Sequence, residues 1–278
     1  MKKVLVTGAG GYIGRHVVEF LNAKNDFVVY SCDISPHSNL TSNHIVKNIL
    51  DEAKSETLYE DLGKPDVIIH LAWQDGFKHN ADSHLDNLSK HFDFLRNMVD
   101  SGCKNISIMG TMHEVGYWEG EINADTPCKP LSMYGIAKNA LRQAIMNYVE
   151  GKDVSLKWLR AYYITGDDRY NNSIFAKILQ MAEEGKKTFP FTDGKNKYDF
   201  IDVNELAKQI SLASIQTEVS GIINVCSGQP VSLKDKVESF IKEKGLDIRP
   251  EYGVYPSRKY DSPAIWGDAG LINKILIK

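Results

Sequence analysis

Residues 4–16 read Val-Leu-Val-Thr-Gly-Ala-Gly-Gly-Tyr-Ile-Gly-Arg-His, which is an apolar run, a glycine-rich turn and the beginning of a helix. Gly8, Gly11 and Gly14 let the backbone approach a pyrophosphate, whose charge is stabilised by the free N–H groups at a helix N-terminus. The spacing is G-x-x-G-x-x-G, not the strict G-x-G-x-x-G, and on its own it also fits a tight strand-to-helix connection. Its place at the start of a strand–helix–strand pattern favours dinucleotide binding.

Short apolar runs alternate with amphipathic stretches, a pattern typical of a parallel sheet covered by helices on both faces. The predicted strands are 3–6, 27–30, 67–71, 106–109 and 156–159, with a short strand and a weak helix within 45–62. The predicted helices are 13–23, 84–101, 132–149, 173–184, 203–214 and 233–244. We predict an α/β fold in which residues 1–165 form a Rossmann-type doubly wound parallel sheet, with a returning strand near 220–226. Residues 166–278 are predicted to form mainly a smaller, interleaved α/β lobe that binds substrate.

Charge and cysteine usage exclude several classes of protein. Among 278 residues there are 33 lysines and arginines and 36 aspartates and glutamates, with no long basic run, so neither nucleic acid nor a membrane surface is a predicted partner. The four cysteines (Cys32, Cys103, Cys128 and Cys226) are scattered, which suggests reduced thiols and a cytoplasmic protein. His79, His84 and His91 lack metal-ligand spacing and are predicted to face solvent, so no metal site is predicted.

Asp33 ends the second predicted strand, at the distance from the glycine turn where such folds bind an adenosine ribose. A carboxylate there accepts a hydrogen bond from the 2′-hydroxyl and repels a 2′-phosphate. No arginine lies within several residues of Asp33. NAD is therefore the predicted cofactor, and NADP stays open because biosynthetic reductases often use NADPH.

Tyr134 and Lys138 stand four residues apart on a predicted helix, so both side chains lie on one face. A nearby ammonium favours the phenolate, and we expect Lys138 to lower the pKa of Tyr134 toward the working pH. Thr111 follows a predicted strand and can hydrogen-bond a substrate oxygen. A lone Tyr-x-x-x-Lys pair occurs by chance on many surface helices, whereas the order of glycine turn, Asp33, Thr111 and Tyr134 is far more specific.

With these motifs the chain resembles, nearly end to end, the extended short-chain dehydrogenases/reductases, the NAD-dependent epimerase/dehydratase family that acts on nucleotide sugars. Residues 7–14 match its T-G-x-x-G-x-x-G fingerprint, residues 66–72 its strand beneath the cofactor, and residues 199–203 its D-F-I-x-V segment. The resemblance implies that Tyr134 is the acid/base, that Lys138 orients the nicotinamide ribose, and that Thr111 polarises the sugar oxygen. It also implies homodimerisation through the predicted helices 84–101 and 132–149.

The remaining predicted contacts divide between cofactor and nucleotide sugar. The resemblance places Asn48 and Ile49 at the adenine, Asn87 in support of the catalytic face, and Arg258 on the sugar-nucleotide diphosphate. The residues predicted to contact the cofactor are Gly8, Gly11, Tyr12, Ile13, Gly14, Asp33, Asn48, Ile49, Leu71, Ala72, Trp73, Asn87, Tyr134 and Lys138. Those predicted to contact the sugar nucleotide are Thr111, His113, Tyr163 and Arg258.

The residues after Thr111 reduce the number of reactions that this family resemblance allows. Sugar-nucleotide dehydratases of this family carry Asp-Glu there, whereas this chain has Met112 and His113, so dehydration is not predicted. Residues 110–116 resemble a G-T-x-x-E-Y-G segment of bacterial reductases acting on 4-keto-6-deoxyhexoses. We predict an NAD(P)-dependent reduction at C4 of such a nucleotide sugar, with Tyr134 as the acid. A UDP-glucose 4-epimerase-like enzyme with tightly bound NAD is the alternative, and a non-enzymatic NAD(H) sensor is a distant one.

Overall fold

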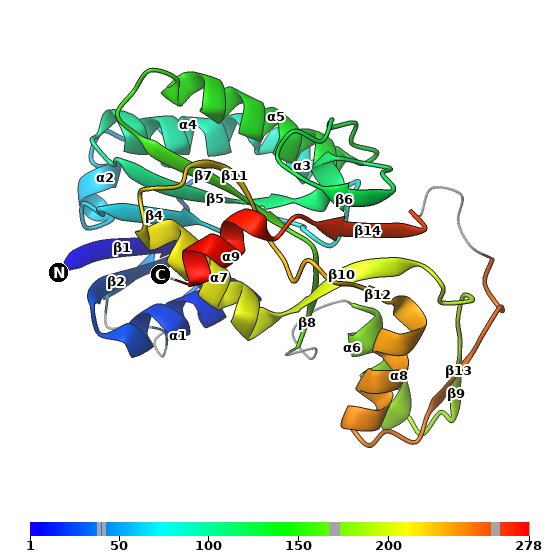
Figure 1. Cartoon of the computed structure of the whole chain (residues 1–278). Coiled ribbons are helices and arrows are strands. Elements are labelled where there is room, and N and C mark those ends of the chain that lie inside the picture. Colours follow the sequence, from blue (N-terminus) through cyan, green and yellow to red (C-terminus); the bar gives the residue numbers. More distant parts are fainter. Residues whose placement is uncertain (38–39, 41–42, 167–172, 257–261, 278) are drawn as a thin grey trace.

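Parallel strands build the main sheet of the computed structural model, which describes residues 1–37, 40, 43–166, 173–256 and 262–277. Within these residues the sheet has seven strands in the order β11-β7-β5-β4-β1-β2-β3 (Figure 1). Their bounds are β1 Lys2–Thr7, β2 Phe27–Asp33, β3 Asn43–Val46, β4 Val67–His70, β5 Asn105–Thr111, β7 Ser155–Ala161 and β11 Gly221–Val225. The order reverses between β1 and β4, and in open parallel sheets ligands bind at the carboxyl ends of the strands flanking such a reversal.

Helices cover both faces of this sheet (Figure 1). One face carries α1 (Gly14–Lys24), α7 (Val203–Ile215) and α9 (Gly270–Leu276), and the other carries α2 (Leu58–Asp61), α4 (Leu88–Asp100) and α5 (Met133–Val149). Successive strand residues point to opposite faces, so Val4 and Val6 join one apolar cluster and Leu5 joins the other. This burial on two sides explains why the strands read as continuous apolar runs.

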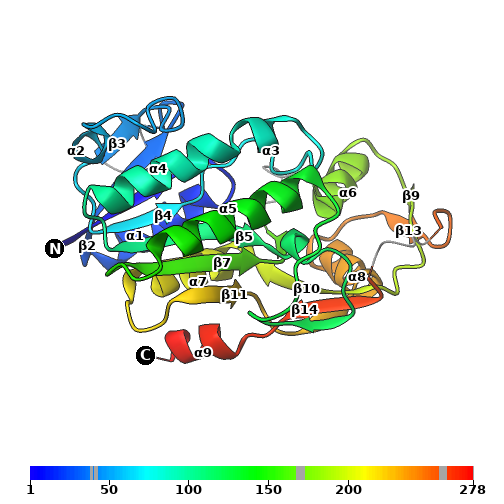
Figure 2. The ribbon, with the colours of Figure 1, turned by 90° about the horizontal axis from the view of Figure 1, so that it is seen from above.

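A second sheet lies beside the carboxyl end of the first (Figure 2). Its path is β12 (Pro230–Ser232), β10 (Lys197–Asp202), β14 (Ala264–Gly267) and β6 (Gly120–Ile122), with β8 (Tyr163–Thr165) also paired to β10. An apolar cluster that includes Phe175, Phe189 and Phe240 holds α6 (Ile174–Glu183) and α8 (Leu233–Glu243) together with the two-stranded sheet of β9 (Thr188–Pro190) and β13 (Arg249–Glu251). Because β6 comes from the connection between β5 and α5, the two sheets share chain from both halves of the sequence.

Asp199 ties the second sheet to the first. Its buried carboxylate accepts hydrogen bonds from the backbone N–H groups of Ser227 and Gly228, each at 2.9 Å, and of Gly267 at 3.1 Å. These donors lie on the loop after β11 and at the end of β14. The aspartate of the D-F-I segment therefore joins three segments of backbone and does not line a ligand cavity.

The predicted fold class is confirmed, and the main differences concern short elements. The helix predicted over 84–101 is divided into α3 (Ser83–Asp86) and α4 at Asn87, whose φ and ψ of −94° and −6° lie at the edge of the right-handed helical region. The short strands expected in the second lobe could not be given bounds, and α9 was not predicted, because three to seven residues are too few to show a periodic pattern. The domain boundary at residue 165 stays a prediction. Three elements after that residue, α7, β11 and α9, belong to the first sheet or pack on it.

Candidate active site

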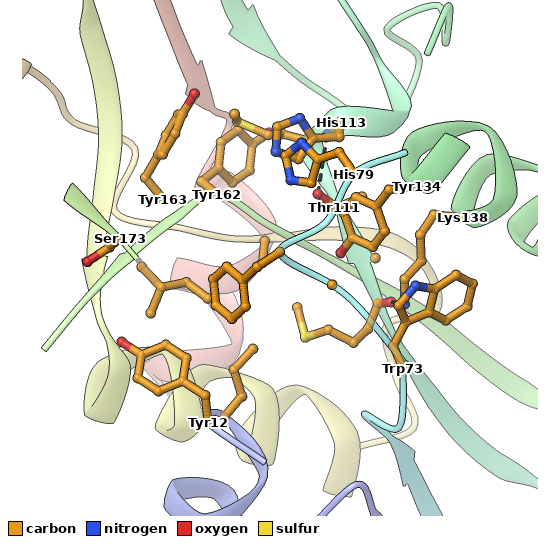
Figure 3. A pocket seen from close by; sticks show the side chains of 18 of the residues that line it. Tyr12, Trp73, His79, Thr111, His113, Tyr134, Lys138, Tyr162, Tyr163 and Ser173 are labelled. Atoms are coloured by element: carbon orange, nitrogen blue, oxygen red, sulfur yellow. Dashed lines mark hydrogen bonds between the residues drawn. The ribbon is translucent and has the colours of Figure 1, made fainter. Parts of the chain in front are cut away.

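A cavity of about 780 Å³ crosses the carboxyl ends of β1, β4 and β5 and reaches the second sheet (Figure 3). Three groups of residues line its length. The glycine turn contributes Gly8, Gly11, Tyr12, Ile13 and Gly14; the middle has Leu71, Trp73, Thr111, His113, Tyr134 and Lys138; and the far end has Tyr163, Phe175, Tyr198 and Phe200. The cavity therefore joins a potential diphosphate site to a polar centre and an aromatic end.

The glycine turn leaves space for a diphosphate, but a side chain at Gly8 or Gly14 would collide with the backbone. Gly8 has a φ of +67°, and a β-carbon there would lie 2.6 Å from the backbone nitrogen of Ala72. A β-carbon on Gly14 would collide with the carbonyl oxygen of Gly8. Because the turn carries no side chains at Gly8, Gly11 and Gly14, its backbone lines the cavity directly. This arrangement fits a bound dinucleotide.

Asp33 lies at the carboxyl end of β2, next to this turn. Its Oδ2 accepts a hydrogen bond from the N–H of Gly10 at 2.9 Å, and its Oδ1 accepts from the N–H of Ile34 at 2.8 Å. The carboxylate is thereby fixed beside the glycine turn, where it fits the ribose of a dinucleotide.

Several predicted cofactor residues lie outside the cavity wall. Asn48 is exposed and donates to Asp51 at 2.7 Å, while Ile49 is buried in the apolar cluster on the α4 side of the sheet. Asn87 donates to Gln74 at 3.1 Å. The predicted residues that do not line the cavity are Asp33, Asn48, Ile49, Ala72 and Asn87. Arg258 lies outside the described residues.

Thr111, Tyr134 and Lys138 meet at the centre of the cavity (Figure 3). Ser132 caps α5 by accepting from the N–H of Gly135 at 3.2 Å, which places Tyr134 on the first turn and Lys138 one turn later. Thr111, at the end of β5, makes a side-chain hydrogen bond with Tyr134. The Nζ of Lys138 donates to the carbonyl oxygen of Met109 at 2.8 Å.

Burial is the largest influence on the pKa values of Tyr134 and Lys138. It raises the pKa of Tyr134 above its ordinary value, and the hydrogen bond from Thr111 opposes this only in part. Burial also lowers the pKa of Lys138 to about 7, against an opposing effect of Glu114. The expected lowering of the pKa of Tyr134 is therefore not found in this structure, where the loss of solvation is the largest effect and raises that pKa.

Glu114 lies outside the cavity wall and accepts a hydrogen bond from the backbone of Thr111. Its Oε1 accepts from the N–H of Thr111 at 2.7 Å and from the indole N–H of Trp158 at 2.8 Å. Its Oε2 lies 3.5 Å from a guanidinium nitrogen of Arg160 and 3.7 Å from Nε of Arg142. The carboxylate is fully buried and does not line the cavity, so it holds the end of β5 and does not face a substrate.

The histidines differ most from the sequence-based expectation. His84 and His91, predicted to face solvent, are each only 1% exposed, because α3 and α4 turn them toward β4 and the cavity loop. His79 is half-buried and lines the cavity, where its ring stacks on Tyr134 with centroids 5.5 Å apart. His113 also lines the cavity, 4.4 Å from His79 between ring centroids, and burial lowers its pKa to about 4.

Sequence reasoning missed His79 and, apart from Tyr163, the aromatic end of the cavity. The loop before α3 brings His79 to the site through a hydrogen bond from the N–H of Tyr134 to its carbonyl oxygen at 2.9 Å. Tyr163 packs against Tyr198, with ring centroids 4.5 Å apart, and against Phe200 at 5.7 Å. No local pattern reports such contacts, because they join residues far apart in the chain. The described residues also contain no cluster of three or more metal-binding side chains.

A doubly wound sheet, a glycine turn open to a cavity, and a Thr–Tyr–Lys group at its centre define a dinucleotide-dependent oxidoreductase. The chain belongs to the NAD dependent epimerase/dehydratase family, whose model matches residues 4–226. This membership confirms the predicted family, the predicted fold class and the dependence on NAD.

Individual relatives and solved structures agree with this assignment. The dTDP-6-deoxy-L-talose 4-dehydrogenase (NAD(+)) of Aggregatibacter actinomycetemcomitans is 48% identical over 267 residues, which cover 95% of this chain and 98% of that protein. The probable UDP-arabinose 4-epimerase 1 of Oryza sativa subsp. japonica is 25% identical over 315 residues, covering 98% and 74%. The crystal structure of Thermus thermophilus UDP-glucose 4-epimerase with NAD has a TM-score of 0.78 at 20% identity, covering 98% of this chain and 92% of that one.

Proposed function

We propose that this enzyme is a nucleotide-sugar 4-ketoreductase that interconverts a dTDP-4-keto-6-deoxyhexose and the 4-hydroxy sugar with NAD(H). The observation that carries the proposal is the 48% identity, over 95% of the chain, to a dTDP-6-deoxy-L-talose 4-dehydrogenase. The cavity supports it, because Thr111 and Tyr134 stand together while the buried Glu114 faces away from it. A dehydratase needs a carboxyl group facing the substrate at this place.

The protein's own groups have distinct tasks in this reaction. When bound, NAD(H) supplies the hydride exchange at C4. Tyr134, whose pKa burial raises, donates its hydroxyl proton to the C4 oxygen during reduction and is left as the phenolate, which takes the proton back during oxidation. The hydroxyl of Thr111 donates a hydrogen bond to the same oxygen as negative charge develops on it. Lys138 binds the nicotinamide ribose, and Asp33 binds the adenosine ribose and so selects NAD.

The cavity wall around Tyr134 suits a sugar ring. His79 and His113 flank the phenol, and burial lowers the pKa of both imidazoles. A neutral imidazole offers one donor and one acceptor nitrogen, which matches the hydroxyl groups of a hexose. We propose these two histidines, with Tyr163, as sugar-nucleotide contacts.

The test is an assay with dTDP-6-deoxy-L-talose and NAD⁺, followed by the formation of NADH. We expect NADH in proportion to the 4-keto sugar formed, and its consumption when the 4-keto sugar and NADH are supplied instead. Isomerisation of UDP-glucose without added cofactor and without net NADH would contradict the proposal and establish the 4-epimerase alternative. Nucleotide binding without turnover of either sugar would support the sensor.

Tyr134→Phe gives a second test of the same proposal. Loss of the proton donor should lower kcat by about 10² or more, with the affinity for NAD retained. Tyr148→Phe is the matched control, because Tyr148 lies at the far end of the same helix and its hydroxyl donates to Asp100 at 2.6 Å. A Tyr134→Phe enzyme with normal kcat would exclude Tyr134 as the acid.

We also propose a cytoplasmic homodimer that associates through α4 and α5. Ile136 and Met133, on the outer side of α5, are 42% and 40% exposed, which supports a protein contact there. The four cysteines are free, and no helix in the described residues is long and apolar enough to span a bilayer. Light scattering of the purified protein tests the dimer, and Ile136→Lys should yield a monomer.

A further inference from the structure

Trp73 contacts the lysine that the reaction uses (Figure 3). It follows β4, and the Nζ of Lys138 lies 3.7 Å from the centroid of the indole ring. The ring of His91 stacks on the same indole, with centroids 4.4 Å apart and an angle of 14° between the planes. An ammonium over the face of a tryptophan is attracted by the negative face of its quadrupole, most strongly where water is excluded.

A hydrogen-bonded network fixes the indole in this place. Its N–H donates to Nδ1 of His84 at 3.1 Å, and Nε2 of His84 lies 2.9 Å from the carbonyl oxygen of Lys78. An indole only donates and a carbonyl only accepts, so His84 carries its proton on Nε2. The tautomer of His84 and the orientation of Trp73 therefore determine each other.

The ring of His91, which stacks on Trp73, is held in place by a chain of hydrogen bonds through His70 to Thr7. Its Nδ1 lies 2.9 Å from Nε2 of His70, and Nδ1 of His70 lies 2.8 Å from Oγ1 of Thr7. Burial lowers the pKa of His70 to about 3 and that of His91 well below its ordinary value, so both rings stay uncharged. Because both imidazoles are uncharged, they do not repel the ammonium of Lys138.

Lys138 has few other groups to stabilise its charge. The side chain is 3% exposed and donates to the carbonyl oxygen of Met109. The titratable groups that act on it or adjoin it are Glu114, Tyr134, His70 and His91. Glu114 alone of these carries a negative charge, and it is already engaged with Arg160 and Arg142. The indole face therefore supplies a stabilising contact that the ammonium does not have elsewhere.

We propose that Trp73 is a positioning residue for Lys138: its π face stabilises the ammonium and holds Nζ at the cavity, beside the carbonyl oxygen of Met109. The proposal rests on the proposed function in one respect, that Lys138 binds the nicotinamide ribose. It predicts that the pH range over which the protein binds NAD depends on an aromatic ring at position 73.

The experiment measures the dissociation constant for NAD by calorimetry across pH for the wild type, Trp73→Phe and Trp73→Leu. Burial brings the pKa of Lys138 to about 7, so the ammonium is present below that pH and is lost as the pH rises. Trp73→Leu removes the π face and keeps an apolar side chain, so it should move downward, by about one unit, the pH at which NAD affinity falls. Trp73→Phe keeps an aromatic face and should stay close to the wild-type midpoint.

Two results would overturn the proposal. One is an equal midpoint in the wild type, Trp73→Phe and Trp73→Leu; the other is an unchanged pH dependence in Lys138→Met, which would mean that another group titrates. Binding of NAD requires no sugar turnover, so a failed 4-ketoreductase assay leaves this test readable.

A fluorinated indole provides the same comparison if Trp73→Leu does not fold. Growth on 5-fluorotryptophan replaces all four tryptophans, keeps their shape and withdraws electron density from the ring face. The midpoint should move downward in the fluorinated wild type and not in fluorinated Trp73→Phe, which has no indole beside Lys138. Equal midpoints in fluorinated and ordinary wild type would overturn the proposal.

Discussion

The backbone N–H of Thr111 donates to Oε1 of Glu114 at 2.7 Å, in a part of the protein from which solvent is excluded. The side chain of Thr111 accepts in return from the N–H of His113 at 3.3 Å. This reciprocal capping fixes the end of β5 where it meets Tyr134. The carboxylate of Glu114, three residues after Thr111, thus supports the candidate site.

Removing the Glu114 carboxylate should damage both stability and catalysis. In Glu114→Leu the guanidinium of the fully buried Arg160 loses its charged partner, so we expect the free energy of unfolding to fall by about 3 kcal/mol. We also expect kcat to fall, because Thr111 loses the bond that positions it. Denaturant unfolding and steady-state kinetics measure the two effects. Asp153→Asn, an exposed carboxylate, is the control, and equal stability of the two variants would refute this role.

Two glycines of the turn should respond differently to alanine. A β-carbon on Gly11 would meet only the carbonyl oxygen of Gly8, at 3.2 Å, so Gly11→Ala should fold normally and lose NAD affinity because its methyl group enters the diphosphate space. Gly8→Ala combines a φ of +67° with a clash against Ala72, and should lower the free energy of unfolding by about 2 kcal/mol or more. Calorimetry and thermal unfolding separate the two outcomes. Wild-type NAD affinity in Gly11→Ala would show that the diphosphate lies elsewhere.

Asp33→Asn should relax the preference for NAD over NADP. The amide can still accept from Gly10, but it no longer repels a 2′-phosphate, so the ratio of the two dissociation constants should change by on the order of tenfold. Asp26→Asn, at an exposed position before β2, serves as the control for a general change of charge. If the ratio stays at its wild-type value, Asp33 does not meet the ribose.

Acid should destabilise the protein through its buried histidines. Burial lowers the pKa of His70 from 6.5 to about 3 and that of His113 from 6.5 to about 4. The unfolded chain then binds more protons than the folded protein below pH 6.5, so the free energy of unfolding decreases as the pH falls, by about 3 kcal/mol for His70 alone between pH 7 and pH 4.

The slope of stability against pH checks this assignment. His113→Gln removes the titration of His113, so this variant should lose less stability than the wild type between pH 6.5 and pH 4. Denaturant unfolding at several pH values gives the slope. Identical slopes in the two proteins would mean that other groups cause the acid sensitivity.

Local patterns were sufficient for the main sheet and for the order of the motifs. Residues 4–6 and 106–109 are buried parts of β1 and β5 whose mainly apolar sequence indicates that burial directly, and the glycine turn follows from its own spacing. Thr111 and Tyr134 could be placed together because strand ends and helix starts meet at the carboxyl edge of a parallel sheet.

The alternation of strands and helices, the glycine turn, and the order of Asp33, Thr111, Tyr134 and Lys138 can all be read from the chain without its fold. The burial of His84 and His91, the stacking of His79 on Tyr134, and the contact of Lys138 with Trp73 become visible only in the folded protein. Periodicity reports how a residue relates to its own helix or strand. Burial of a polar side chain depends on partners distant in sequence, and proton affinity follows from that burial.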